Sequence, residues 1–198
     1  SRRVLVYKMQ GLSFREYIGM KLGIDLPAYP LEQIVNHEVE LPIEIDHPLS
    51  LFNEYLRQGY YPFYEDEGYK MRLNQVVSIT LETDIPQYAN YTVTISRKLK
   101  ELMQVIADSV PFKPNMSTIA TIIKADRGLL PDYFELMEKA GLIAQLHDST
   151  KGVRGLGKVE KVYLDNTNLS FALTSETPDI GNQRETFFLT LTKCVPIK

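Results

Sequence analysis

Residues 117–164 read STIATIIKADRGLLPDYFELMEKAGLIAQLHDSTKGVRGLGKVEKVYL, and this stretch decides the fold. Apolar residues recur at helical spacing over 117–124 and 129–140, which predicts two helices. Over 142–147 and 159–164 apolar and polar residues alternate, which predicts two strands. Helix, helix, strand, glycine-rich loop and strand is the order of a winged helix. The side chains expected to face its core are Ile119, Ile122, Ile123, Leu130, Tyr133, Phe134 and Met137.

The residues before this module predict further helices. These are expected over 13–22, 31–35, 48–58, 69–83 and 95–108. Ser13 and Glu16 have the spacing of a capping box, and Gly23 is suited to end the helix that follows. Asp84-Ile85-Pro86 is expected to end the helix that starts at Tyr69, because proline lacks the backbone N–H that a helix interior needs. The helix over 95–108 is the first of the three helices usual in a winged helix.

Two segments between these helices are predicted to be irregular. Residues 38–47 hold four acidic residues and Pro42, which predicts an exposed connector. The aromatic residues of 60–64 are expected to pack between helices; stacking of the tyrosines on a nucleic-acid base is the alternative.

Composition limits the class of protein. The chain has 198 residues, a net charge of −3 and one cysteine, Cys194. The charge argues against a protein that coats nucleic acid over its whole surface. A single cysteine excludes an internal disulfide and fits a cytoplasmic location. No apolar run approaches the roughly 20 residues of a membrane span, so no membrane segment is expected.

The loop between the two predicted strands resembles a phosphate-binding motif. Residues 152–158, GVRGLGK, have the spacing G-x-x-x-x-G-K. The next residue is Val159, so the hydroxyl that would hold magnesium is missing, and the residues that follow alternate like a strand instead of opening a helix. We interpret the glycines as the tip of a hairpin that needs positive φ angles.

The same hairpin is basic, whereas the helix before it is acidic. Lys151, Arg154, Lys158 and Lys161 are candidates to contact a nucleic-acid backbone from the wing. The presumed recognition helix carries Asp132, Glu135, Glu138 and Lys139, a net negative set that phosphates would repel. Residues 117–170 hold seven basic and seven acidic residues, so their net charge is zero. We therefore expect either a weak contact with nucleic acid through the wing or a protein partner.

No catalytic or metal site is predicted. His37, His47 and His147 have no partner at helical spacing, and the cysteine is distant in sequence, so the metal prediction is none. No nucleophile has an identifiable base, so the catalytic prediction is also none.

Five segments, taken in chain order, resemble a large prokaryotic AAA-type ATPase family. Residues 11–17, GLSFREY, resemble the segment that follows the last strand of that family's ATPase core. Residues 54–62, EYLRQGYYP, resemble a helix end and loop of the family, and 82–86, ETDIP, another helix end. Residues 138–143, EKAGLI, are similar to part of its winged helix. Residues 181–188, GNQRETFF, resemble the helix that opens its C-terminal nuclease-like domain of unknown function.

The resemblance implies that the chain is a fragment that lacks an ATP-binding core. ATP and Mg²⁺ would bind that core in the parent protein, whereas this chain would hold no cofactor and no activity. Arg2 and Arg3 match a basic position of the family near the end of the core, where they would contact a nucleotide phosphate; a solvated strand start is the alternative. Glu185 matches the nuclease-like helix, but the other residues of such a site are not in the chain.

The resemblance also divides the chain and predicts its fold class, mainly α with a small β-wing. The divisions are 1–23 for the end of the core and the following helix, 24–94 for a helical lid, 95–173 for the winged-helix domain and 174–198 for the start of a truncated C-terminal domain. The predicted function is the lid and winged-helix region of an AAA-type ATP-binding protein that couples nucleotide state to a bound partner. The alternatives are a winged-helix DNA-binding regulator and a protein-interaction scaffold.

Overall fold

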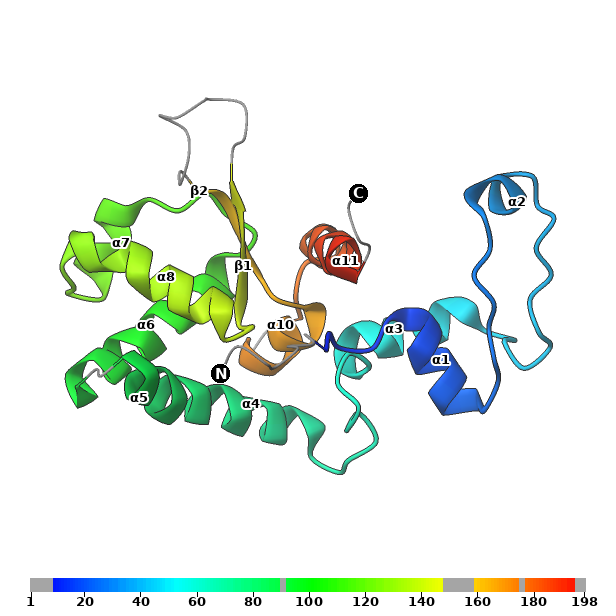
Figure 1. The fold of residues 1–198 in the computed structure, drawn as a ribbon, viewed down its shortest axis with the longest axis horizontal. Coiled ribbons are helices and arrows are strands. Elements are labelled where there is room, and N and C mark those ends of the chain that lie inside the picture. The colour runs from blue at the N-terminus through cyan, green and yellow to red at the C-terminus, as the bar shows by residue number, and fades with distance from the viewer. Residues whose placement is uncertain (1–8, 90–91, 148–158, 175–176, 195–198) are drawn as a thin grey trace, which may run out of the picture. The chain divides into compact units, whose positions relative to one another are not determined.

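The computed structural model describes residues 9–89, 92–147, 159–174 and 177–194 (Figure 1). The described part is mainly helical with one two-stranded antiparallel sheet, which confirms the predicted fold class. The chain forms two compact units, Ser1–Glu65 and Asp66–Lys198. This division falls inside the predicted lid segment, 24–94, and rests on contacts alone, so the predicted domain boundaries stay predictions.

The first unit contains α1 (Phe14–Leu22), α2 (Leu31–Val35) and α3 (Pro48–Gln58). The predicted capping box is present: Glu16 N donates to Ser13 Oγ at 3.3 Å, and Ser13 N donates to Glu16 Oε2 at 2.7 Å. Gly23 follows α1 with a φ of 68°, a left-handed conformation that glycine adopts without strain. The predicted connector over 38–47 contains no helix or strand.

Aromatic side chains hold α1 and α3 together. Phe14 lies 5.2 Å from Phe52, and Tyr17 lies 5.5 Å from Tyr55, between ring centroids. Tyr64 of the aromatic loop lies 4.9 Å from Tyr17. Such edge and tilted ring pairs add to the free energy that burial already contributes.

Tyr60 belongs to the aromatic loop that follows α3. Its side chain is buried, and its ring leaves no room for a Cβ atom on Gly11. The Tyr60 carbonyl accepts a hydrogen bond from Leu12 N at 2.7 Å. The aromatic loop was predicted to pack between helices; Tyr60 and Tyr64 are buried, and Tyr64 lies against Tyr17 of α1.

In the second unit one helical run continues further than predicted. It comprises α4 (Tyr69–Ile79), the π-helical turn η1 (Thr80–Asp84) and α5 (Ile85–Ala89). The prediction that Asp84-Ile85-Pro86 ends the helix is wrong. Pro86 cannot donate to the preceding turn, and its ring would collide with a carbonyl of a regular α-helix. The wider turn, in which Ile85 N donates to Thr80 O, carries the chain past this obstacle.

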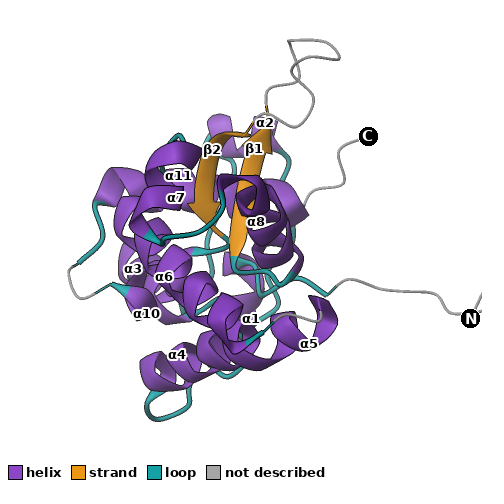
Figure 2. Ribbon diagram, turned by 90° about the vertical axis from the view of Figure 1, so that its left-hand side faces the viewer, coloured by secondary structure: helices purple, strands orange, loops and turns teal. Residues whose placement is uncertain are grey.

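The winged-helix order is present in α6 (Val93–Ser109), α7 (Met116–Ile122), α8 (Leu130–Lys139), β1 (Ile143–His147) and β2 (Val159–Leu164). A short 3₁₀ turn, η2 (Arg127–Leu129), leads into α8. The strands pair from Ile143 opposite Leu164 to His147 opposite Val159, with an irregularity at Leu146/His147. On its other edge β2 forms a bridge with Phe112, which lies between α6 and α7. Figure 2 shows the two strands beside α7 and α8.

The predicted core of this module is confirmed except at one residue. Ile119, Ile123, Leu130, Tyr133, Phe134 and Met137 are buried, whereas Ile122 is 55% exposed. A helix turns by about 100° per residue, so Ile119, Ile123 and Ala120 span one arc, and Ile122 lies about 60° outside it. Ala120 completes the buried face of α7 in place of Ile122.

Two helices follow the hairpin, α10 (Thr167–Leu173) and α11 (Ile180–Cys194). Tyr69 Oη donates to Oδ1 of the fully buried Asn168 at 2.5 Å, and Asn74 Nδ2 donates to Ala172 O at 2.9 Å. These bonds join α4 to α10. Because buried polar groups need partners, they fix one packing arrangement of the two helices.

The capping box makes the stability of the chain depend on pH. Hydrogen bonds from the Ser13 hydroxyl and backbone N–H hold the pKa of Glu16 below its ordinary 4.5. A lowered folded-state pKa gives stability that is present above pH 4.5 and lost as the pH falls through the folded pKa. We predict that Glu16→Gln lowers the free energy of unfolding near neutral pH by roughly 0.3–1 kcal/mol. Urea unfolding at a series of pH values measures this, and the difference from wild type should vanish at low pH.

Glu40→Gln, in the exposed connector, is the matched control and should leave the free energy of unfolding unchanged at every pH. An equal pH-dependent effect of both substitutions would contradict the role of the capping box.

Glu138 joins α8 to β1. Its Oε1 accepts Gln145 N at 2.7 Å, and its Oε2 accepts Gln145 Nε2 at 2.9 Å. We predict that Glu138→Ala lowers the free energy of unfolding by about 1–3 kcal/mol, because both donors lose a charged acceptor. Glu135→Ala removes only an exposed pair with Lys139 and should change it by less than about 0.5 kcal/mol. Chemical unfolding of both variants measures this difference. Equal losses of stability would contradict the proposed role of the Glu138–Gln145 hydrogen bonds.

Candidate interaction groove

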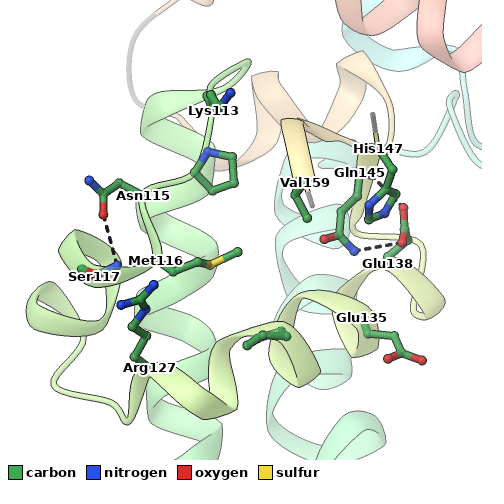
Figure 3. A pocket seen from close by; sticks show the side chains of 12 residues that line it. Lys113, Asn115, Met116, Ser117, Arg127, Glu135, Glu138, Gln145, His147 and Val159 are labelled. Carbon is green, nitrogen blue, oxygen red and sulfur yellow. Dashed lines mark hydrogen bonds between the residues drawn. The ribbon is translucent and has the colours of Figure 1, made fainter. Parts of the chain in front are cut away.

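A cavity of about 900 Å³ lies between α8, the start of α7 and the hairpin (Figure 3). It follows the outer face of the helix that a DNA-binding winged helix would place in the major groove. We call it the α8 groove. Its lining residues are Lys113, Pro114, Asn115, Met116, Ser117, Arg127, Pro131, Glu135, Glu138, Gln145, His147 and Val159.

The fold brings these residues together from separate segments. Phe112 is bridged to β2, so the residues directly after it, Lys113 to Met116, lie opposite the hairpin. Asn115 caps α7 by accepting from Ser117 N and Thr118 N, both at 3.1 Å. Part of the groove surface is apolar, because Pro114, Met116, Pro131 and Val159 belong to it.

Most charges around the α8 groove are already paired. Lys113 Nζ lies 2.6 Å from Glu160 Oε2, and Lys139 Nζ lies 2.5 Å from Glu135 Oε1. Glu138 is bonded to Gln145. The Glu135 carboxylate raises the pKa of Lys139. These pairs leave the groove with little net charge that is not already compensated.

Arg127 and His147 differ from the other polar lining residues. Both side chains are exposed, and neither has a hydrogen bond or ion pair with another residue of the described ranges. Arg127 stands at the start of the turn before α8, and His147 at the end of β1. A ligand in the groove therefore meets a cation at the α7–α8 side and an imidazole at the hairpin.

The outer face of α8 is acidic. Asp132 and Glu135 are exposed, and Asp132 lies in the first turn of the helix. Carboxylates at these positions repel the phosphates of a duplex that brings its major groove against α8. The apolar part of the α8 groove lies beside this face and is suited to apolar side chains of a protein.

Of the four predicted wing cations, the structure describes one. Lys151, Arg154 and Lys158 lie outside the described residues, as do Arg2 and Arg3.

Lys161, on β2, is directed to α11. Its Nζ lies 2.5 Å from Glu185 Oε2 and 5.6 Å from the centre of the Tyr163 ring. The hydrogen bond to Glu185 raises the pKa of Lys161. Lys161 does not line the α8 groove. Glu185 is thus held beside the hairpin.

That Lys113, Arg127 and His147 line one groove was not predicted from the sequence. They are separated along the chain and come from the α6–α7 connector, the α7–α8 turn and a strand end. No local spacing marks such a set, because only the Phe112 bridge and the packing of α8 bring the segments together.

The described ranges contain no group of three or more His, Cys, Asp or Glu residues arranged to hold a metal ion. None of the helices in these ranges combines the length and the apolar character needed to cross a bilayer.

Comparison with known proteins gives one match. The model of a domain of unknown function, DUF8612, matches residues 49–179, which includes α4 to α10 and most of α3. No curated protein and no solved structure matches the chain. The match covers more than half of the chain, which therefore belongs to the DUF8612 family.

Proposed function

We propose that the chain is the lid and winged-helix region of an AAA-type ATP-binding protein and that its winged helix docks a protein partner. The observation that carries the choice of partner is the surface of α8. Its exposed acids oppose duplex DNA, and the α8 groove beside them offers apolar surface and one uncompensated cation, Arg127.

The positions of the family-like segments support the ATPase part of the proposal. Residues 11–17 enter and begin α1, and 54–62 end α3 and enter the aromatic loop. Residues 82–86 form the π turn and the start of α5, and 138–143 connect α8 to β1. Residues 11–17, 54–62 and 138–143 lie at helix boundaries, whereas 82–86 lie within one continuous helical run.

Contacts inside the second unit provide a route for coupling. The η1 turn and α5 pack against α6, the first helix of the winged helix, and α4 is joined to α10. A movement of the α4–η1–α5 run that follows nucleotide binding in the missing core would therefore reach the winged helix as a rigid-body displacement. ATP and Mg²⁺ belong to that core, and this chain alone would not hydrolyse ATP.

DNA binding is the second candidate. It is favoured by Arg127 at the start of α8 and by the basic residues of the predicted wing, Lys151, Arg154 and Lys158. The two candidate functions differ in the effect of the acidic residues of α8. If the partner is a protein, these acids prevent duplex DNA from binding. If the partner is DNA, the attraction between the wing cations and the phosphates is stronger than the repulsion by these acids.

Binding of a fluorescent duplex of mixed sequence at low salt separates the candidates. We predict no binding by the chain, and a gain of about tenfold or more in affinity for Asp132→Lys/Glu135→Lys, because the repulsion is removed. Glu67→Lys/Glu101→Lys makes the same change of charge at exposed positions away from α8 and should gain less. Duplex binding by wild type that is lost on replacing Lys151, Arg154 and Lys158 by alanine would establish the second candidate instead.

The ATPase part of the proposal is tested on the complete reading frame and its product. We expect codons for a phosphate-binding loop and an acidic strand end upstream of residue 1, and ATP hydrolysis by the full-length protein but not by this chain. A frame without these motifs would refute the ATPase assignment and leave the docking role of α8 to be judged by the duplex experiment alone.

A further inference from the structure

A second cavity, of about 510 Å³, lies among α6, α10 and α11, away from the α8 groove. We call it the α11 cavity. Its lining contains two carboxylates, Asp108 and Asp179, and no lysine, arginine or histidine. The remaining polar lining residues are Gln104, Ser170, Thr174, Thr177, Asn182, Gln183 and Thr186.

The inner wall of the α11 cavity is made of buried polar side chains. Ser170, Gln183 and Thr186 are 7%, 8% and 2% exposed. Gln183 Nε2 donates to Pro178 O at 2.6 Å, which leaves the amide oxygen as an acceptor. The hydroxyls of Ser170 and Thr186 have no hydrogen-bond partner in the part of the chain that the structure describes.

The Ser170 and Thr186 hydroxyl oxygens have no partner in the described protein but are not fully enclosed, so a ligand or water in the cavity can bond to them. Thr190, one turn after Thr186, satisfies its own hydroxyl with Thr186 O and Asp165 O, at 2.9 and 3.2 Å. The Thr186 and Ser170 hydroxyls make no such hydrogen bond to the described protein and line the cavity, so they are available to bond to a ligand there.

The charges that line the α11 cavity favour a cationic ligand over an anionic one. Two N-terminal amides of α11 are already used, since Asn182 N donates to Asp179 Oδ1 and Gln183 N to Asp179 O, both at 3.0 Å. An anion in the cavity therefore meets no cationic side chain in the lining and cannot use these two amides. Both carboxylate oxygens of Asp108 accept from Gln104 Nε2, at 2.9 and 3.0 Å, and the exposed carboxylate has room for a further donor.

We propose that the α11 cavity binds a guanidinium group. The acceptors come from three helices: the Asp108 carboxylate from α6, the Ser170 hydroxyl from α10, and Gln183 Oε1 and the Thr186 hydroxyl from α11. A guanidinium carries five N–H donors in one plane, so it can bond to several walls at once. Free arginine and an arginine side chain of a partner protein share this chemistry. The inference does not depend on the function proposed for α8.

Isothermal titration calorimetry of the chain with arginine and with citrulline, its uncharged isostere, tests the proposal. Arginine should bind, and citrulline should bind at least about tenfold more weakly, because the bond to a charged acceptor is lost. The blocked tripeptide acetyl-Gly-Arg-Gly-amide distinguishes the sources. If it binds more tightly than arginine, the site takes a partner's side chain; if it binds more weakly, the site takes the free amino acid.

Two variants test whether arginine binds in the α11 cavity. Asp108→Asn should weaken arginine binding about tenfold, and Thr186→Val about threefold to tenfold. Thr186→Val keeps the side-chain shape and removes a hydroxyl that is bonded to no described residue, so the fold should be retained, as thermal unfolding can verify. Glu101→Gln, an exposed acid on the same helix as Asp108, is the control and should bind as wild type does.

The proposal is overturned if arginine does not bind, if citrulline binds equally well, or if Asp108→Asn and Thr186→Val both bind arginine as wild type does. None of these results bears on the docking role of α8, whose test uses DNA and different residues.

Discussion

The arrangement of the second unit depends on two backbone hydrogen bonds between Val162 and Phe112. Val162 N donates to Phe112 O at 2.9 Å, and Phe112 N donates to Val162 O at 3.3 Å. These bonds fasten the connector between α6 and α7 to the hairpin, and β1 occupies the other edge of β2. Since Lys113 to Met116 follow Phe112 directly, the same bonds set one wall of the α8 groove. Without them α7 could still pack through Ile119 and Ile123, but the groove would lose its fixed width.

The paired charges around the α8 groove decide what it can attract. Lys113 with Glu160, and Lys139 with Glu135, are surface pairs that contribute little to stability. Their effect on recognition is larger, because Lys113 and Lys139 each have their field reduced by a carboxylate within 3 Å, which leaves Arg127 as the uncompensated cation of the groove. Binding to phosphates grows with the number of cations that are free to release counterions. A surface that compensates its cations internally is better suited to specific contacts with protein than to a polyanion.

Two predictions that rest on consecutive residues were correct. The predictions that were wrong concern segments whose structure depends on tertiary contacts. The capping box of Ser13 and Glu16 and the alternation of 159–164 are written in consecutive residues, and both were predicted with their correct positions. Pro86 was read as a helix end because its local effect is to break a regular helix; packing of η1 and α5 on α6 favours continuation through a wider turn. The helix α10 has seven residues and buries the polar Thr167, Asn168 and Ser170 beside Leu169 and Ala172, so its apolar periodicity was too weak to predict a helix. The α8 groove and the α11 cavity are assembled from distant segments and leave no pattern in the sequence.

The helix α11 reverses the usual arrangement of an amphipathic helix. Its inward face carries Gln183, Thr186 and Thr190, whereas Ile180 and Phe188 are 62% and 68% exposed. Burial of the apolar face would have been the more favourable packing if the surrounding wall were apolar. That wall contains Ser170 and other polar residues, so the polar face of α11 packs on a polar surface; Ile180 and Phe188 are exposed, and Phe187 and Leu189 are half-buried. A buried hydroxyl needs a hydrogen-bond partner, and the α11 cavity lies where the Ser170 and Thr186 hydroxyls have none from the described protein. The exposure of Phe188 and the polar lining of the α11 cavity therefore have the same cause: α11 packs with its polar face inward.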